Sequence, residues 1–195
     1  MSYVVHGATG AQGSPVVSAL LATGAPVAAI TRDQELSLGG AETVVADLSS
    51  AESLIRAYRN AEGVFVHLPA APEQTLRPMV GNIVAAMQAT TPARVVVSTS
   101  GMMVSPPQHP TTQAREDSAV AALISGITAL GLPCAVIEPR LFLENLLMPP
   151  ITAAVRSEGV LRYPVREDLP ISWASHRDIA DAAVSLLLAR TEIAG

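Results

Sequence analysis

Short runs rich in valine and isoleucine alternate with longer stretches of helical period along the chain. This alternation is typical of parallel strands joined by helices, because two parallel strands need a long crossover connection. Helices then cover both faces of the sheet, so its strands are apolar on both sides. Six strands are predicted, at Tyr3–His6, Val27–Thr31, Thr43–Ala46, Gly63–His67, Arg94–Ser98 and Cys134–Glu138.

The segments between these runs carry apolar residues at helical spacing, which predicts helices that each pack one stripe on the sheet. Ser175 is followed three residues later by Asp178, a capping box with Asp in place of Glu that predicts the start of the last helix. A length of 195 residues is typical of one domain, so a single domain is expected over residues 1–195. The stripes are Val16, Val17, Leu20 and Leu21, then Leu76, Met79, Val80, Ile83 and Met87, then Ile179, Ala182, Ala183, Leu186 and Leu187.

The first strand leads into a glycine-rich turn, Gly-Ala-Thr-Gly-Ala-Gln-Gly at residues 7–13, and then into a helix with Pro15 in its first turn. Three glycines permit a tight turn, close approach of backbone N–H groups to a ligand, and close packing of the helix. The helix N-terminus adds partial positive charge, so the turn predicts a dinucleotide site; a glycine turn without a ligand is the alternative. The expected contacts are Gly7, Thr9, Gly10, Ala11, Gln12 and Gly13.

The end of the second strand bears on which dinucleotide binds. Arg32 and Asp33 follow that strand. An arginine at this place pairs with the 2′-phosphate of NADP, whereas an acid bonds the free 2′-hydroxyl of NAD. Because Arg32 comes first, NADP(H) is favoured over NAD(H), with a solvated Arg32–Asp33 pair as the alternative. Asp47 and Leu48 are expected to flank the adenine, although Asp47 as the cap of a helix beginning near Ser50 is an equally good interpretation.

All twelve positively charged residues are arginines, so the chain has no lysine. This excludes a lysine-based phosphate loop, a Schiff-base enzyme and a Tyr/Lys catalytic pair. A net charge of −5 without a basic block makes nucleic acid an unexpected partner. A single cysteine and four histidines without helical ligand spacing argue against a metal site. No apolar run is long enough to span a membrane, so a cytoplasmic protein is expected.

Several motifs, in order along the chain, resemble the NmrA-like branch of the atypical short-chain dehydrogenase/reductase superfamily. They are the glycine turn, Thr31-Arg32, Val95–Ser100, Glu138–Asn145 and Ser172–Ala180. The resemblance implies an α/β fold of the Rossmann type, a doubly wound parallel sheet with helices on both faces that binds NAD(P)(H). The family's Arg-Pro reads Glu138-Pro139-Arg140 here. The chain ends at Gly195, so the family's C-terminal substrate lobe is expected to be short or missing.

The resemblance also implies a choice of functions, because members are reductases of quinones, dyes or flavins, isoflavone-reductase-like enzymes, or redox-sensing regulators. Classical members of the superfamily use a tyrosine activated by a lysine, which this chain lacks. An acceptor that needs little proton help, such as a quinone, a flavin or a conjugated cation, therefore fits best. We expect an NADPH-dependent reductase for such an acceptor. The alternatives are an NAD(P)-sensing regulatory protein without turnover and a shortened paralogue without cofactor affinity.

Candidate substrate residues follow the fourth, fifth and sixth strands, because ligands bind at the carboxyl ends of parallel strands. His67 is expected to donate a proton and Ser100 to hold a substrate oxygen. A histidine that caps a strand end and a turn-forming serine are the alternatives. Further cofactor contacts are expected from Leu68, Pro69, Ser98, Pro139 and Phe142, the last of which borders the nicotinamide end in relatives.

Two further segments have open interpretations. The proline-rich stretch Ser105–Pro110, which contains His109, is either a lid over the nicotinamide or an inert loop. Leu141–Met148 is apolar but short, which predicts a buried or interface segment rather than a membrane span. The expected partner is a small-molecule substrate, and a homodimer is left open.

Overall fold

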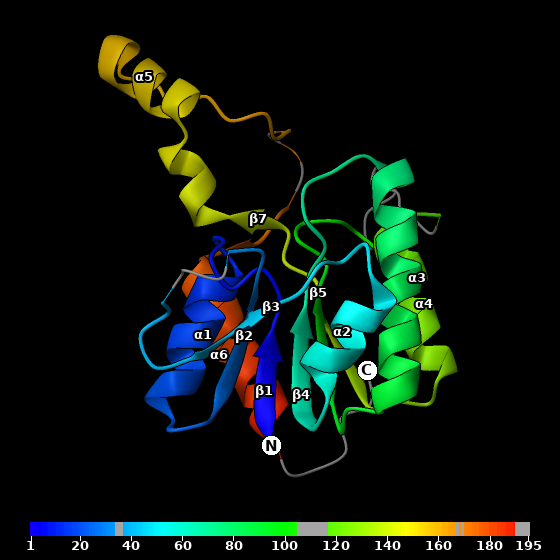
Figure 1. The fold of residues 1–195 in the computed structure, drawn as a ribbon. Coiled ribbons are helices and arrows are strands. Elements are labelled where there is room, and N and C mark those ends of the chain that lie inside the picture. Colours follow the sequence, from blue (N-terminus) through cyan, green and yellow to red (C-terminus); the bar gives the residue numbers. More distant parts are fainter. Residues whose placement is uncertain (34–36, 105–116, 167, 169, 190–195) are drawn as a thin grey trace.

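The computed structural model describes residues 1–33, 37–104, 117–166, 168 and 170–189. Its centre is a six-stranded parallel sheet with the strand order β3-β2-β1-β4-β5-β6 (Figure 1). All six predicted strands are confirmed, and the largest shift is in β4, which begins at Ala61 rather than Gly63. The strands are β1 (Ser2–Val5), β2 (Val27–Thr31), β3 (Glu42–Val45), β4 (Ala61–Val66), β5 (Val95–Ser98) and β6 (Cys134–Ile137).

Helices cover both faces of this sheet, as the alternating pattern predicts (Figure 1). The helices α1 (Gly13–Ala22) and α6 (His176–Leu188) pack on one face. The helices α2 (Ala51–Tyr58), α3 (Glu73–Thr90) and α4 (Ala119–Ala129) pack on the other. Successive side chains of a strand point to opposite faces of the sheet. Val4 therefore belongs to the core under α2, α3 and α4, whereas Tyr3 and Val5 belong to the core under α1 and α6. The doubly wound α/β fold is therefore confirmed.

The apolar stripes predicted for the helices are largely the buried ones, with one error in α6. Ile179, Ala183 and Leu187 are buried there, together with Ala180 and Val184. Ala182, which was predicted to share this stripe, is exposed. Successive helical residues are about 100° apart, so a stripe centred between Ala183 and Leu187 leaves Ala182 beyond its edge. The capping box at the start of α6 is confirmed in both of its hydrogen bonds.

After β6 the chain leaves the sheet and forms an arm, which we define as residues 143–166. It follows β7 (Leu141–Phe142) and contains the 3-10 helix η1 (Leu143–Leu147) and α5 (Pro149–Glu158), which projects away from the sheet (Figure 1). The chain then returns through β8 (Trp173–Ala174), which pairs in parallel with β7. No residue of α5 is buried.

The segment Leu141–Met148, predicted to be buried or to lie in an interface, is buried in the fold only near its start. Leu147 is 73% exposed and Met148 is 51% exposed, whereas Phe142 is buried. The physical reason is that η1 turns the chain away from the sheet directly after Phe142, so only the first residues of the segment reach the core. Across the described residues, no helix has the length and apolar character that crossing a membrane requires.

The capping box at the start of α6 leads to a stability prediction. Replacing Ser175 by Ala removes the hydroxyl that accepts a hydrogen bond from the backbone N–H of Asp178. We expect the free energy of unfolding in urea to fall by about 1 kcal/mol. The matched control is Ser185→Ala in the same helix, an exposed position where the change should stay within about 0.5 kcal/mol. Equal losses in the two variants would contradict a capping role for Ser175.

Candidate functional site

The glycine turn brings the start of α1 against the end of β1. Gly7 has a φ of +57°, in the left-handed region that glycine tolerates best. A Cβ atom on Gly13 would lie 2.2 Å from the carbonyl oxygen of Gly7 and 2.5 Å from that of His6. Both contacts are with backbone atoms, so no side chain can move away to make room. Gly7 and Gly13 therefore have the structural roles predicted for them: Gly7 permits the tight turn, and Gly13 permits the close packing of the helix.

The N-terminus of α1 differs from those of three other helices in the described chain. Ser50, Ser118 and Ser175 cap α2, α4 and α6 with their side chains. Gln12 is the N-cap of α1 and makes no side-chain cap, and the first turn of α1 contains no acidic residue. The partial positive charge of this helix end is therefore not offset by its own first turn, which suits an anionic ligand.

A pocket of about 490 Å³ adjoins this turn at the carboxyl ends of the strands. Predicted cofactor residues and residues without a predicted role share its wall. The predicted ones are Gly7, Thr9, Arg32, Asp47, Leu48, His67 and Pro69. The others are His6, Ile30, Thr31, Asp33, Ala46 and Met79.

Besides Asp33, two charged residues of opposite sign stand in the wall of this pocket, Arg32 and Asp47. Both are exposed. Asp47 accepts a hydrogen bond of 2.8 Å from the backbone N–H of Ser49. Hydrogen bonding with Ser49, and to a smaller extent the charge of Arg32, holds the pKa of the Asp47 carboxyl below its usual value. Ser50, and not Asp47, caps α2, so the interpretation of Asp47 as that cap is wrong.

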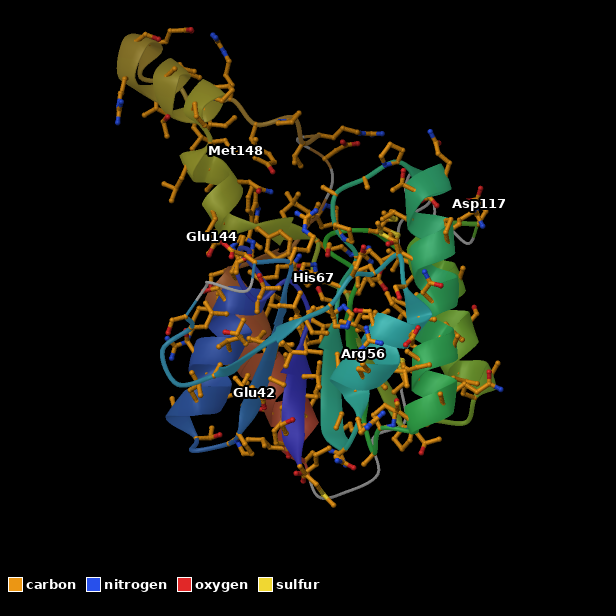
Figure 2. All side chains as sticks on the ribbon, viewed as in Figure 1. Glu42, Arg56, His67, Asp117, Glu144 and Met148 are labelled. Atoms are coloured by element: carbon orange, nitrogen blue, oxygen red, sulfur yellow. The ribbon has the colours of Figure 1, made fainter. Side chains whose placement is uncertain are left out.

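A second pocket of about 440 Å³ shares His67 and Pro69 with the first. The predicted residues Ala11, Gln12, Leu68 and Ser100 also line it. Ala70, Ala71, Leu76, Thr99, Met102, Val120 and His176 line it without having been predicted. The two pockets therefore meet at His67, which Figure 2 shows at the end of the sheet that faces the arm.

A hydrogen-bonded link joins the glycine turn to the end of β5. The Ser98 hydroxyl donates to Oε1 of Gln12 over 2.8 Å, and Nε2 of Gln12 donates to the Ser100 hydroxyl oxygen over 2.9 Å. Ser100 has a φ of +57°, which is uncommon for a residue other than glycine. A strained backbone conformation of this kind persists where surrounding contacts stabilise it. At Ser100, the hydrogen bond from Gln12 is such a contact.

His67 lies directly beneath the glycine turn. A Cβ atom on Gly7 would approach its Nε2 atom to 2.5 Å, so the imidazole and the turn are in close contact. Its Nδ1 atom lies 3.3 Å from the carbonyl oxygen of Leu68. Burial lowers the pKa of His67 below the usual value. The predicted role of His67 as a proton donor stays a prediction.

A second histidine, His6, is buried next to this site. Its Nε2 atom lies 2.6 Å from the hydroxyl of Tyr58, which comes from α2. Burial, with a smaller contribution from His67, lowers the pKa of His6 to about 3. Burial raises the pKa of Tyr58. Both groups are therefore neutral at pH 7 and form an uncharged buried pair.

The remaining predicted cofactor residues line neither pocket. Ser98 and Pro139 are buried, and the Phe142 ring stacks on the ring of His176 with centroids 4.5 Å apart. Glu138 and Arg140, where the sequence departs from the family pattern, form an ion pair of 2.9 Å. Gly10 contributes through its backbone, because its N–H donates to the carbonyl oxygen of Gly7. His109 and the stretch Ser105–Pro110 lie outside the described residues.

The described residues contain no group of three or more His, Cys, Asp and Glu side chains that could hold a metal ion. Cys134 is half-buried, and burial raises the pKa of its thiol to about 11. The thiol is therefore uncharged at neutral pH and a weak nucleophile.

Sequence reasoning missed two histidines of the site. His6 is part of the glycine-turn motif, but its burial depends on α2 packing over β1, which the motif does not report. His176 reaches the second pocket across 76 residues of separation from Ser100. Its sequence signals were the family-like motif Ser172–Ala180, which contains it, and the capping box, which placed it in the first turn of a helix.

The close approach of Gly13 to Gly7 predicts a large effect of a single methyl group. We expect Gly13→Ala to lower the free energy of unfolding by about 2 kcal/mol or more, because a Cβ atom there meets backbone oxygens. Gly81→Ala is the matched control, since Gly81 lies in α3 with no atom within 4 Å of a Cβ position. That variant should gain about 1 kcal/mol through helix propensity. Urea unfolding of both variants measures the difference, and a stable Gly13→Ala protein would contradict the contact.

The buried His6 predicts loss of stability in acid. The pKa of His6 is about 3 in the folded chain, whereas its ordinary value is 6.5. Below pH 6.5 the imidazole of the unfolded chain therefore binds a proton, whereas that of the folded chain does not. As the pH falls below 6.5, this residue lowers the free energy of unfolding by about 1.4 kcal/mol per pH unit. Above pH 6.5 it has no such effect. Urea unfolding between pH 6.5 and 5 should show a shallower slope for His6→Gln, which cannot titrate. Equal slopes would show that His6 is protonated in the folded chain.

Comparisons with known proteins place this fold. Comparison with curated proteins gives no match. The Citrobacter sp. triphenylmethane reductase solved with NADP(H) is 19% identical, with a TM-score of 0.78 over 98% of this chain and 67% of its own. The Escherichia coli NADPH-dependent quinone oxidoreductase solved with NADPH is 22% identical, with a TM-score of 0.76 over 100% of this chain and 69% of its own. A nucleoside-diphosphate-sugar epimerase from Staphylococcus aureus is 17% identical, with a TM-score of 0.80 over 97% of this chain and 67% of its own.

These likenesses show the fold, an α/β fold of the Rossmann type, and the chain spans about two thirds of the length of these three structures. The family comparison is more specific, because it covers residues 2–195, which include the glycine turn, both pockets and the arm. The chain is a member of the NmrA-like family.

Proposed function

We propose that residues 1–195 act as one NAD(P)-binding domain and that the protein is an NADPH-dependent reductase of a quinone-, dye- or flavin-like acceptor. The observation that carries this proposal is the junction of the two pockets. The first is lined by Gly7, Thr9 and Arg32, the second is lined by Gln12 and Ser100, and both share His67 and Pro69. A long cofactor with one reactive end fits a site that consists of two adjoining pockets.

The residues of the first pocket fit the phosphate and adenosine parts of NADP(H). The contact between Gly7 and Gly13 leaves no room for a side chain, and the α1 N-terminus has no side-chain cap, so backbone N–H groups are available to a pyrophosphate. Arg32 is exposed in the wall and is proposed to pair with the 2′-phosphate. Thr9, Asp47 and Leu48 complete this end.

The residues of the second pocket suit a flat, conjugated acceptor. Leu76, Met102 and Val120 supply apolar wall, which excludes water from the reacting atoms. Bound NADPH would supply the hydride. The Ser100 hydroxyl oxygen accepts a hydrogen bond from Gln12, which leaves its own hydrogen to donate to an acceptor oxygen. His67 is proposed to contact the acceptor as a neutral imidazole, because burial lowers its pKa.

Support for the proposal also comes from the proteins with similar folds, two of which are described as an NADPH-dependent quinone oxidoreductase and a triphenylmethane reductase. A titration of the purified chain with NADPH and with NADH, followed by nucleotide fluorescence and thermal stability, tests the site. We expect NADPH to bind more tightly and to raise the melting temperature, because a ligand of the native state stabilises it.

Acceptor turnover is the second half of this test. NADPH oxidation should accelerate with 1,4-naphthoquinone or with a cationic triphenylmethane dye over the rate without acceptor. Binding without any acceleration across quinones, dyes and flavins would contradict the reductase and favour the alternative, an NAD(P)-sensing regulatory protein. No binding of either dinucleotide would contradict both.

Arg32 gives a sharper test of cofactor preference. We expect Arg32→Ala to weaken NADPH by about 1 to 3 kcal/mol, roughly 5- to 150-fold, and to weaken NADH much less. Arg59→Ala is the matched control, because Arg59 is also exposed but lines neither pocket. That control removes the same charge and should change both affinities little. Equal losses of affinity for NADPH and NADH in Arg32→Ala would show that Arg32 does not pair with the 2′-phosphate.

A further inference from the structure

His176 lines the second pocket and has no part in the function as proposed so far. It is the first residue of α6, and the capping box of Ser175 and Asp178 fixes the backbone there. The pairing of β7 with β8 places Phe142 opposite Ala174, two residues before His176. Two segments far apart in the sequence therefore meet beside the pocket.

Three contacts hold His176, one at its backbone and two at its ring. Its backbone N–H donates to Oε1 of Glu144 over 2.9 Å, and its Nδ1 atom lies 3.3 Å from Oε2 of the same carboxylate. Its ring stacks on Phe142 at an interplanar angle of 27°. The side chain is 15% exposed. Because the Nδ1 edge faces Glu144 and one face of the ring is covered by Phe142, the Nε2 edge is the one left for a ligand of the pocket.

One carboxylate lies directly opposite the Nδ1 atom of this ring. Glu144, at the base of the arm (Figure 2), is the carboxylate that faces Nδ1. The strands β7 and β8 contribute only apolar residues. Asp178 is engaged in the capping box with Ser175, and His67 is the other imidazole in the pocket wall. A carboxylate at Nδ1 orients the ring and stabilises the imidazolium, as in other histidines that transfer protons.

We propose that His176 is the proton donor for acceptors that are reduced at oxygen. The assignment rests on the proposed function. A quinone takes up a hydride from NADPH, which is thereby oxidised by two electrons, and becomes a hydroquinone anion. The Nε2–H bond of the imidazolium then breaks as an O–H bond forms on the anion. The products are a neutral hydroquinone, NADP⁺ and a neutral imidazole, which solvent reprotonates.

The two proposed acceptor classes differ in their need for this proton. A triphenylmethane dye is a carbocation, and hydride addition to its central carbon already gives a neutral product. A quinone needs one hydride and one proton. Removal of the proton donor should therefore slow quinone reduction more than dye reduction, whereas general damage to the site slows both.

The test compares the two rates in one variant. For His176→Gln with NADPH, we expect the ratio of kcat with 1,4-naphthoquinone to kcat with malachite green to fall by about 100-fold, a modest value for loss of a general acid. Glutamine can still donate to Glu144 but cannot release a proton. An unchanged ratio would overturn the assignment. Should His176→Gln fail to fold, Glu144→Gln is the second variant, and its ratio should fall in the same direction.

His67→Gln is the matched control, because His67 is the other imidazole of this pocket. We expect both rates to fall together in this variant, since His67 supports the glycine turn. A fall of the ratio in His67→Gln with none in His176→Gln would identify His67 as the donor and overturn the proposal. The quinone rate of the wild type should also decline with rising pH, and His176→Gln should lose this dependence.

A binding measurement without dinucleotide separates this assignment from the proposed function. Trp173 is the single tryptophan and lies in β8, three residues before His176, so its fluorescence reports on 1,4-naphthoquinone binding. We expect binding to be about fivefold tighter at pH 6 than at pH 8 in the wild type, because a charged donor strengthens the hydrogen bond, and equal in His176→Gln. Equal affinities at both pH values in the wild type would overturn the assignment. Absence of NADPH oxidation with either acceptor would instead overturn the proposed function.

Discussion

The backbone contact between Gly7 and Gly13 is the constraint on which the rest of this structure depends. With the Gly7 oxygen 2.2 Å from the position of a Cβ on Gly13, α1 begins directly above the end of β1. The helix can then lie flat on one face of the sheet against α6, and its N-cap Gln12 lines the second pocket while Gly7 lines the first. Fold and candidate cofactor site therefore come from the same few atoms, because any side chain at this place would move the helix away from both.

Polar contacts across long stretches of sequence organise the carboxyl edge of the sheet. Gln12 is bonded to Ser98 and Ser100, and His6 contacts Tyr58 beneath the turn. Burying such groups stabilises a fold only where their hydrogen bonds are made, and the edge of a sheet carries fewer apolar contacts than its centre. These contacts join segments that are distant in the sequence at the edge where the two pockets lie.

The arm and the second pocket are connected through the segment that follows β6. Phe142 lies at the point where the chain leaves the core, and its ring stacks on the ring of His176. Glu144 belongs to η1 at the base of the arm and faces the same imidazole. The position of the arm and the geometry of the candidate proton donor are thus set by the same residues, so a displacement of η1 would change both.

Local patterns in the sequence determined the strands, the glycine turn and the capping box of Ser175 with Asp178, because each depends on neighbours within a few residues. Periodicity misplaced Ala182, since burial is set by what an element packs against. The sequence also determined that these 195 residues contain no lysine. Only the tertiary structure brought His176 to Ser100 in one pocket wall, because parallel strands and crossover helices join residues whose separation no local pattern records.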